Sequence, residues 1–203
     1  MKSAQILFIT GTDTGVGKTV FAALSTVYLR QNGFRVAALK PLCSGGRQDA
    51  HTLHAAAAKV ILVDEVNPWF FRAPLAPLLA ARKENKRVNL REVAAHIRRI
   101  AKRFEVVVVE GAGGLLSPLG EDFDSRDLIK ALNATPIIVC PNKLGAVNQV
   151  RLVLEALPAG ARRNARVVLV NPQNPDAAGR TNLQLLREYV ELDRVRVIPW
   201  IKI

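Results

Sequence analysis

A glycine-rich stretch near the start of the chain has the composition of a phosphate-binding loop. Gly11, Gly15 and Gly17 follow a short apolar run, and Lys18 and Thr19 open a stretch with helical character. Glycines let the backbone wrap closely around phosphate oxygens, so that N–H groups and the helix N-terminus point at the anion. Lys18 would reach the β- and γ-phosphates, and the Thr19 hydroxyl would coordinate Mg²⁺. Gly11 and Gly17 enclose five residues, one more than the usual motif, but the position after a strand still favours a nucleotide-binding loop.

A carboxylate suited to the metal of such a loop ends a second apolar run. Residues 106–109 are all valine, and Glu110 follows them directly. The next four residues, Gly111, Ala112, Gly113 and Gly114, carry almost no side chain, so a ligand could approach the backbone closely. A buried strand that ends on one carboxylate and a glycine run indicates a metal-binding or nucleotide-binding position. The alternative is a structural glutamate that caps a helix.

A lysine ends a third run with strand character. Lys40 follows Arg35–Leu39 and precedes Pro41. In a parallel sheet, ligands bind beyond the carboxyl ends of the strands, so Lys40 is expected on the same rim as the loop and Glu110. A cation there would stabilise negative charge that develops between a nucleotide and its acceptor.

The elements that must position these residues alternate along the chain. The pattern predicts an α/β fold with a mostly parallel twisted sheet flanked by helices, similar to P-loop NTPases, in one domain covering 1–203. Strands are expected at 6–10, 35–40, 105–110, 136–140, 166–170 and 195–198, and helices at 18–31, 49–59, 90–104, 125–133, 146–157 and 182–191. Asp124 or Ser125 is expected to cap the helix that begins near 125.

Composition narrows the class of protein. The chain has 203 residues, of which 49% are hydrophobic and 23% charged, as in ordinary folded proteins. No apolar stretch is long enough to cross a bilayer, and the first apolar run is too short for a secretory signal. Two cysteines, Cys43 and Cys140, are too few for a disulfide framework, so a reducing cytoplasm is expected.

The formal net charge of +12 raises the question of a polyanionic partner. Nine basic residues lie between Arg82 and Arg103, and in 90–104 they alternate with an apolar stripe at helical spacing. This arrangement favours a helix with a solvated cationic back over contact with nucleic acid. Aromatic residues, which would stack on bases, make up only 5% of the chain.

Four segments together make the chain resemble the dethiobiotin synthetase family within the P-loop NTPase superfamily. They are 10–19 (TGTDTGVGKT), Lys40-Pro41 followed by Ser44-Gly45, 109–114 (VEGAGG) and 142–148 (NKLGAVN). The resemblance implies a cytoplasmic homodimer that uses ATP and Mg²⁺ to close the ureido ring of dethiobiotin from 7,8-diaminononanoate and carbon dioxide. A carbamate forms first, the γ-phosphoryl group passes to its oxygen, and the second amine attacks the mixed anhydride.

The resemblance also implies a role for each matching residue. Lys40 and Lys18 would be catalytic, and Thr19, Asp49 and Glu110 would hold the metal. The nucleotide would contact Thr14, Gly15, Val16, Gly17, Lys18, Thr19, Val20, Asp49, Glu110, Gly111, Ala112, Gly113, Asn171, Pro199 and Trp200. The diamine substrate would contact Thr14, Lys40, Ser44, Leu144, Gly145, Ala146, Val147 and Asn148, with the last five holding its carboxylate tail across a dimer interface.

Two other functions remain open on the sequence. A partitioning or septum-type regulatory ATPase would share the phosphate-binding loop, but such proteins usually carry a second lysine early in it, where this chain has Thr12-Asp13-Thr14. A basic nucleic-acid-binding module is the other alternative.

His51 and His54 lack the further ligands of a zinc site, and Cys43 has no partner histidine that would make it a nucleophile. Asn171-Pro172 leaves the preferred base of the nucleotide undetermined.

Overall fold

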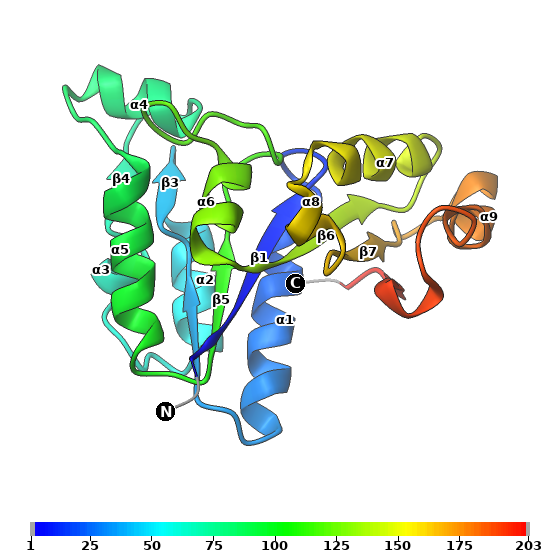
Figure 1. Cartoon of the computed structure of the whole chain (residues 1–203), viewed down its shortest axis with the longest axis horizontal. Helices are drawn as coiled ribbons and strands as arrows, with labels where there is room; N and C mark the ends of the chain where they lie inside the picture. The colour runs from blue at the N-terminus through cyan, green and yellow to red at the C-terminus, as the bar shows by residue number, and fades with distance from the viewer. Residues whose placement is uncertain (1–2, 202–203) are drawn as a thin grey trace.

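The computed structural model describes residues 3–201, and a six-stranded sheet forms its centre (Figure 1). The strands lie in the order β2-β5-β1-β6-β7-β8, and every neighbouring pair is parallel. A separate parallel pair consists of β3 and β4. The bounds of the eight strands among these residues are β1 Gln5–Gly11, β2 Val36–Leu39, β3 Leu42–Ser44, β4 Trp69–Phe71, β5 Val106–Glu110, β6 Thr135–Pro141, β7 Arg166–Val170 and β8 Val195–Ile198.

Helices cover both faces of the large sheet. Right-handed crossovers dictate this, because α1 connects β1 to β2 in one direction across the sheet and α6 connects β5 to β6 in the other. β2 and β5 are consequently buried along their whole length. The helices are α1 Lys18–Gln31, α2 Gln48–Ala56, α3 Val63–Val66, α4 Pro77–Lys83, α5 Leu90–Ala101, α6 Ser125–Leu132, α7 Ala146–Ala156, α8 Ala159–Arg162 and α9 Ala177–Leu186, with a 3₁₀ turn at Leu192–Arg194.

The register of the strands brings three chain segments to one level. Ile9 pairs with Glu110 between β1 and β5, and Leu39 pairs with Val109 between β2 and β5. The residues that follow, Gly11 and Lys40, therefore lie at the same carboxyl edge as Glu110. The sheet itself thus fixes the relative positions of the phosphate-binding loop, the lysine and the carboxylate.

The predicted fold class is confirmed, and α1 begins and ends where the sequence predicts. Asp124 caps α6 by accepting hydrogen bonds from the backbone N–H groups of Arg126 and Asp127, as expected. On α5, Val93 and Ile97 are buried while the basic side chains face solvent, which confirms the amphipathic pattern. Among residues 3–201, no helix has both the length and the apolar composition required to cross a membrane.

One predicted helix was misplaced and several short elements were missed. The helix expected at 182–191 is α9, which begins five residues earlier because Asp176 caps it by accepting a hydrogen bond from the Gly179 N–H. The apolar side chains of 183–190 suggested a later start, and Gly179 masked the first turn. The predictions contained none of the elements β3, β4, α3, α4 and α8, each of which has at most seven residues and is too short to show a clear period.

Candidate active site

The glycine-rich loop curls between β1 and α1 in a shape that its glycines permit. Gly15 and Gly17 have φ values of 72° and 95°, in the left-handed region, where a side chain would be strained. A Cβ at Gly11 would lie 2.7 Å from the Val16 side chain, so the turn needs a glycine there as well. Lys18 begins α1 and its ammonium donates a hydrogen bond to the Asp13 carbonyl oxygen at 2.6 Å. The lysine therefore lies across the concave side of the loop.

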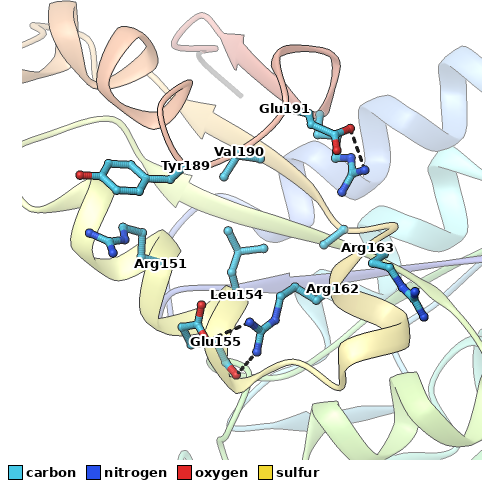
Figure 2. Close-up of a pocket in the computed structure, with 10 residues that line it drawn as sticks. Arg151, Leu154, Glu155, Arg162, Arg163, Tyr189, Val190 and Glu191 are labelled. Carbon is cyan, nitrogen blue, oxygen red and sulfur yellow. Dashed lines mark hydrogen bonds and ion pairs between the residues drawn. The ribbon is translucent and has the colours of Figure 1, made fainter.

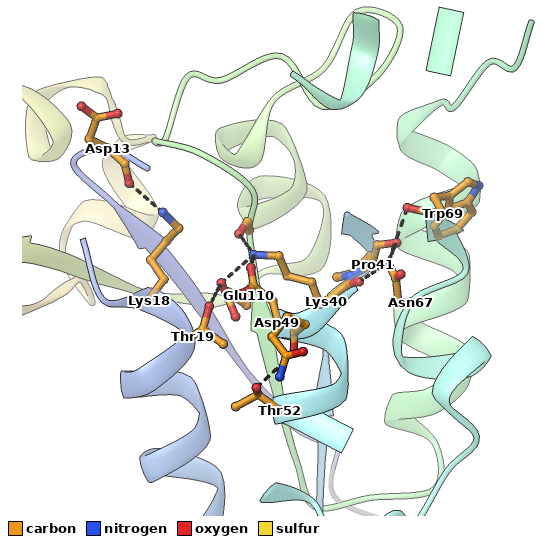
Figure 3. Close-up of polar contacts among 12 residues, drawn as sticks. Asp13, Lys18, Thr19, Lys40, Pro41, Asp49, Thr52, Asn67, Trp69 and Glu110 are labelled. Atoms are coloured by element: carbon orange, nitrogen blue, oxygen red, sulfur yellow. Dashed lines mark hydrogen bonds and ion pairs between the residues drawn. The ribbon is translucent and has the colours of Figure 1, made fainter. Parts of the chain in front are cut away.

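A cluster of opposite charges lies beside the loop, with Lys40 and Glu110 buried and Asp49 partly exposed (Figure 3). The Lys40 ammonium contacts Glu110 Oε1 at 2.6 Å, Asp49 Oδ2 at 3.0 Å and the Gly111 carbonyl oxygen at 3.1 Å. The Thr19 hydroxyl donates to the same Glu110 oxygen at 2.8 Å. The side chains of Lys40 and Glu110 are only 6% and 1% exposed. The structure thus brings together the lysine, the threonine and both carboxylates that the sequence singled out.

Burial and charge act against each other in this cluster. Burial alone would lower the pKa of Lys40, but the carboxylates of Glu110 and Asp49 outweigh it and raise that pKa. Burial raises the pKa of Glu110, although Lys40 opposes the shift. The pKa of Lys18 falls to about 8, first because the group is buried and then because Lys40 repels its charge. Lys40 therefore stays charged near neutral pH, and Lys18 is close to its titration range.

A cavity of about 770 Å³ opens in front of this cluster. It is wide enough for two small molecules, since ligand pockets commonly measure ~300–1,000 Å³. Its walls come from the glycine-rich loop, from the end of β2, from β3 and the first turn of α2, and from the segments around 74–77 and 110–117. The sequence-derived candidates that line it are Thr14, Gly15, Gly17, Lys18, Thr19, Val20, Lys40, Ser44, Asp49, Glu110, Ala112 and Gly113.

The donor set of the cluster fits a magnesium ion. Glu110 Oε2 is buried and has no hydrogen-bond partner among the described residues, so one carboxylate oxygen is left for a cation. Thr19 and Asp49 add oxygen atoms, which Mg²⁺ prefers as ligands. Within residues 3–201, no group of three or more His, Cys, Asp or Glu side chains is arranged to hold a metal. A few protein oxygens together with phosphates is the usual coordination of Mg²⁺ at nucleotide sites.

A second, smaller pocket of about 260 Å³ adjoins the other side of the glycine-rich loop. Asn171, Pro199 and Trp200 line it together with Gly15, Val16 and Val20, so the region assigned to the nucleotide base lies next to the loop. The Asn142 side chain holds Asn171 by donating a hydrogen bond to its Oδ1 at 2.7 Å. One nucleotide could extend from this pocket over the loop into the large cavity.

Residues 144–148 lie apart from both pockets. Gly145, with a φ of 90°, caps α7, and Ala146 is buried at its start. Leu144 is 80% exposed, and its backbone N–H donates to Asp176 Oδ2 at 2.9 Å. None of these five residues lines the large cavity within the described chain.

Several residues that shape the site escaped the sequence analysis. Asn67, which is buried, donates hydrogen bonds from its side chain to the carbonyl oxygens of Lys40 and Pro41 and so fixes the end of β2. Ser117 accepts a hydrogen bond from the Gly114 N–H and holds the glycine run in place. Asn67 precedes a proline in a loop, which is a signal of a turn but not of a partner 27 positions away along the chain.

Cys43 lines the cavity but is not a nucleophile. Burial raises the pKa of its thiol to about 11, so the reactive thiolate is scarce at neutral pH. This agrees with the sequence-based interpretation. His54, one of the two histidines considered there, contacts the Ile61 carbonyl oxygen through Nε2 at 2.9 Å.

Comparison with known proteins identifies the relatives of the chain. The family model described as AAA domain matches residues 5–203. ATP-dependent dethiobiotin synthetase BioD of Bacillus licheniformis is 35% identical over 198 residues, covering 95% of this chain and 84% of the relative. The protein of the same name from Anaeromyxobacter sp. is 43% identical and covers 75% and 70%. That from Methanococcus vannielii is 35% identical and covers 75% and 72%.

Among solved structures, the chain is similar to a ParA family ATPase from Chlorobium tepidum TLS. The TM-score is 0.61, and the match covers 98% of this chain and 86% of the other. The sequence identity is 13%, so this likeness bears on the fold alone. It agrees with a parallel sheet flanked by helices and carrying a phosphate-binding loop.

Proposed function

Because the chain belongs to the dethiobiotin synthetase family, we propose that it is an ATP-dependent cyclo-ligase of biotin biosynthesis. Its substrates are 7,8-diaminononanoate, carbon dioxide and ATP, and its organic product is dethiobiotin. Residues 1–203 act as one P-loop ligase domain, in the cytoplasm and as a homodimer.

The observation that carries this proposal is the meeting of Lys18, Lys40 and Glu110 at one cavity. Transfer of a phosphoryl group to a carbamate brings several negative charges together. Positive groups fixed beforehand lower the barrier because they need not reorganise as charge develops. A cavity large enough for a triphosphate and a diamine, with two lysines in its wall, provides that environment.

The reaction proceeds in three steps in this cavity. One amine of the substrate attacks carbon dioxide and loses a proton, which gives a carbamate. A carbamate oxygen attacks the γ-phosphorus of ATP, and ADP leaves. The second amine then attacks the carbamate carbon and loses a proton, the bond from that carbon to the phosphate oxygen breaks, and the ring closes with release of inorganic phosphate. Two molecules held in line react far faster than free ones, which is the main contribution of the cavity walls.

Each residue of the site takes one part in this scheme. The backbone N–H groups of the glycine-rich loop and Lys18 bind the phosphates. Lys40 stabilises the carbamate and the oxygen that becomes bonded to phosphorus. Ser44 lies at the end of β3 and contacts the diamine, and Asn171, Pro199 and Trp200 surround the nucleotide base. Mg²⁺, held by Thr19, Asp49 and Glu110, supplies charge neutralisation for the phosphate oxygens when it is bound.

The homodimer and the binding of the substrate tail belong to the same proposal. Leu144 and Leu152, in and before α7, are largely exposed although both are apolar. A second copy that covers α7 would bury them and would bring the start of that helix to the cavity of its partner. There the backbone N–H groups of Gly145, Val147 and Asn148 would bind the carboxylate tail of the diamine, since the Ala146 N–H already donates to the Lys143 carbonyl oxygen.

A regulatory ATPase of the partitioning type is not favoured. Lys18 is the only lysine in 10–19, so the early lysine of such proteins is missing. The likeness to a ParA family ATPase bears on the fold, and fold does not determine function. The basic surface of α5 is the solvated back of an amphipathic helix, so a nucleic-acid-binding module is not favoured either.

The experiment is a measurement of ADP release by the purified protein with each substrate left out in turn. Release is expected only when diaminononanoate and bicarbonate are both present, with one dethiobiotin per ADP by mass spectrometry. Steady hydrolysis of ATP without either substrate, with no ring product, would reject the proposal. The variant Arg91→Gln on the exposed face of α5 serves as a control that should behave as wild type.

A further inference from the structure

The backbone on both sides of Lys40 is held by the segment that follows α3. The Lys40 N–H donates a hydrogen bond to the Val66 carbonyl oxygen at 3.0 Å, and the Trp69 N–H donates one to the Pro41 carbonyl oxygen at 3.1 Å. β2 is an edge strand of the large sheet, so residues 66–69 take the position of a neighbouring strand at its end. The support of Lys40 therefore comes from outside the large sheet.

Asn67 fills the space between this segment and the end of β2 (Figure 3). Its side-chain amide donates to the Lys40 carbonyl oxygen at 2.8 Å and to the Pro41 carbonyl oxygen at 3.2 Å. The residue is only 1% exposed, so water cannot readily replace these contacts. Because a buried carbonyl oxygen without a donor is costly, the turn after β2 depends on this amide.

Arg47 fixes which end of the Asn67 amide faces Lys40. Its Nε donates to Asn67 Oδ1 at 3.0 Å, and its Nη2 donates to the backbone carbonyl oxygen of Asn67 at 2.8 Å. A guanidinium group can only donate, so the amide oxygen must face Arg47 and the amide nitrogen must face Lys40. A flipped amide would place its oxygen against two carbonyl oxygens.

The same arginine connects Lys40 to Asp49. Arg47 directly precedes α2, and Asp49 lies in the first turn of that helix. Asp49 Oδ2 in turn contacts Lys40 Nζ at 3.0 Å. The contacts form a closed ring that runs from Lys40 through Asn67 and Arg47 to Asp49 and back to Lys40. The guanidinium fork of Arg47 therefore sets the position of the start of α2 relative to the end of β2.

The other contacts of Arg47 are weaker. Its ion pair with Asp64 at 2.8 Å is on the surface, since Asp64 is 80% exposed, and exposed pairs contribute little to stability. The guanidinium lies 5.4 Å from the centre of the Phe70 ring. Within the described chain, neither Arg47 nor Asn67 lines the large cavity. Any effect of these two residues on the reaction must therefore pass through Lys40 and Asp49.

We propose that Arg47 and Asn67 are positioning residues that hold Lys40 in place for phosphoryl transfer, an inference that rests on the proposed function. A shift of a reacting group by about 1 Å can lower a rate by about 10²-fold, so loss of the guanidinium fork lowers turnover. The hydrogen bonds of Arg47 go to Asn67 and Asp64 and not to the glycine-rich loop. The affinity for the nucleotide is therefore unaffected.

The variant Arg47→Ala tests this role, because it removes the fork and leaves space for a free guanidinium ion. The kcat of ring closure is expected to fall by a factor of about 10–100, while the affinity for ADP, measured by fluorescence titration, changes by less than about twofold. Guanidinium chloride at millimolar concentration should restore part of the lost turnover, whereas sodium chloride should not. A merely structural role would lower the Tm and leave the kcat of the folded protein unchanged.

The matched control is Arg103→Ala. Arg103 also makes one ion pair, with Glu65 at 2.8 Å, and also lies over an aromatic ring, 5.7 Å from the centre of Phe104, but its hydrogen bond goes to Glu65 and not to Asn67. Its kcat should equal that of the wild type. Arg47→Met keeps an apolar side chain beside Phe70 and provides the same test of kcat if Arg47→Ala fails to fold.

A wild-type kcat in the folded Arg47 variant, or an affinity for ADP that falls as much as kcat, would overturn the proposal. A crystal structure of the variant tests the positioning role without relying on the reaction. It should show the Asn67 amide turned and Lys40 Nζ displaced from Glu110 by about 1 Å, the size of shift that affects catalysis. Both side chains in their wild-type positions would overturn the proposal. A wild type that forms no dethiobiotin would instead reject the proposed function, and the comparison of the two structures would still decide the positioning role.

Discussion

Replacing Lys40 by methionine removes the positive charge that holds the centre of the site together. Lys40 Nζ lies 2.6 Å from Glu110 Oε1, and both side chains are almost completely buried. At this distance and an effective dielectric constant of ~20, the attraction amounts to about 6 kcal/mol, part of which offsets the desolvation of both ions. Loss of one partner from a buried pair usually costs about 3–5 kcal/mol. We expect a loss of that size in the free energy of unfolding at pH 8.

The double variant Lys40→Met with Glu110→Gln isolates the pair interaction. Glutamine keeps the shape of Glu110 and can accept the hydrogen bond of the Thr19 hydroxyl, but it carries no charge to leave unpaired. Most of the lost stability should therefore return, with a coupling energy of at least about 2 kcal/mol in a double-mutant cycle. Urea unfolding at constant ionic strength measures all four proteins. The reasoning is refuted if the loss in the free energy of unfolding of the double variant equals the sum of the losses of the two single variants.

The pH dependence of the single variant provides a second check. Burial raises the pKa of Glu110 in the folded protein, and without Lys40 the rise is larger. A carboxyl group with a raised folded pKa contributes stability below its unfolded pKa and loses it as the pH rises. The stability deficit of Lys40→Met should thus shrink as the pH falls from 8 toward about 5, where Glu110 is protonated more often. A deficit that grows in this range would contradict the assignment of the buried charge to Glu110.

The same variant separates catalysis from nucleotide binding. The rate of ring closure should fall by a factor of about 10²–10³ if Lys40 stabilises charge in the transition state. The affinity for ADP should change by less than about threefold, which corresponds to under 1 kcal/mol. The reason is that the polar contacts of the Lys40 ammonium go to Glu110, Gly111 and Asp49 and not to the glycine-rich loop. Fluorescence titration with ADP and mass spectrometry of the product measure the two effects. Unchanged turnover in a folded variant would show that Lys40 has no part in the reaction.

Three further predictions follow from single residues. The pKa of Lys18 is lowered to about 8 in the folded protein, so the unfolded chain binds this proton more tightly. The free energy of unfolding of the wild type, relative to that of Lys18→Met, should therefore rise from pH 8 to about pH 10. Urea unfolding measures this difference, and a flat or falling difference would contradict the prediction. Gly113→Ala should lower stability by about 1–3 kcal/mol in thermal unfolding, since φ is +69° and the new Cβ would collide with Ser117; an unchanged Tm would refute the strain. Trp200→Ala should weaken ADP binding by about fivefold through loss of ring stacking, whereas Tyr28→Ala on the exposed face of α1 should not; equal effects would remove Trp200 from the nucleotide site.

The central part of the fold could be predicted because its strands carry strong local signals. The valine run before Glu110 and the glycine-rich loop before α1 specify strand ends and turns through backbone sterics alone. Once the sheet is parallel, its carboxyl edge follows, and with it the meeting of Lys40 and Glu110. This much of the candidate site is a consequence of topology.

The remaining features depend on contacts between distant parts of the chain. The Asn67 side chain donates a hydrogen bond to the Lys40 carbonyl oxygen, and the Asn142 side chain donates one to Asn171 Oδ1. The spacing of these residues along the sequence reveals neither contact. The true start of α9 depends on the capping of its first turn by Asp176. The carboxylate of Asp176 also accepts a hydrogen bond from the backbone N–H of Leu144. A pocket lined by four arginines is likewise assembled from α7, α8 and the segment before β8 (Figure 2), and nothing in the local sequence sets Arg151, Arg162, Arg163 and Arg194 apart from the many other arginines.

The most direct test of the account follows oxygen from carbon dioxide in the first turnover. With ¹⁸O-labelled carbon dioxide in unlabelled water, the carbamate oxygen that attacks the γ-phosphorus stays on phosphorus when the ring closes. Inorganic phosphate from rapidly quenched reactions should therefore carry one ¹⁸O atom for each dethiobiotin formed, detected by mass spectrometry. Dethiobiotin accompanied by unlabelled phosphate would contradict a carbamate phosphorylated between Lys18, Lys40 and Glu110.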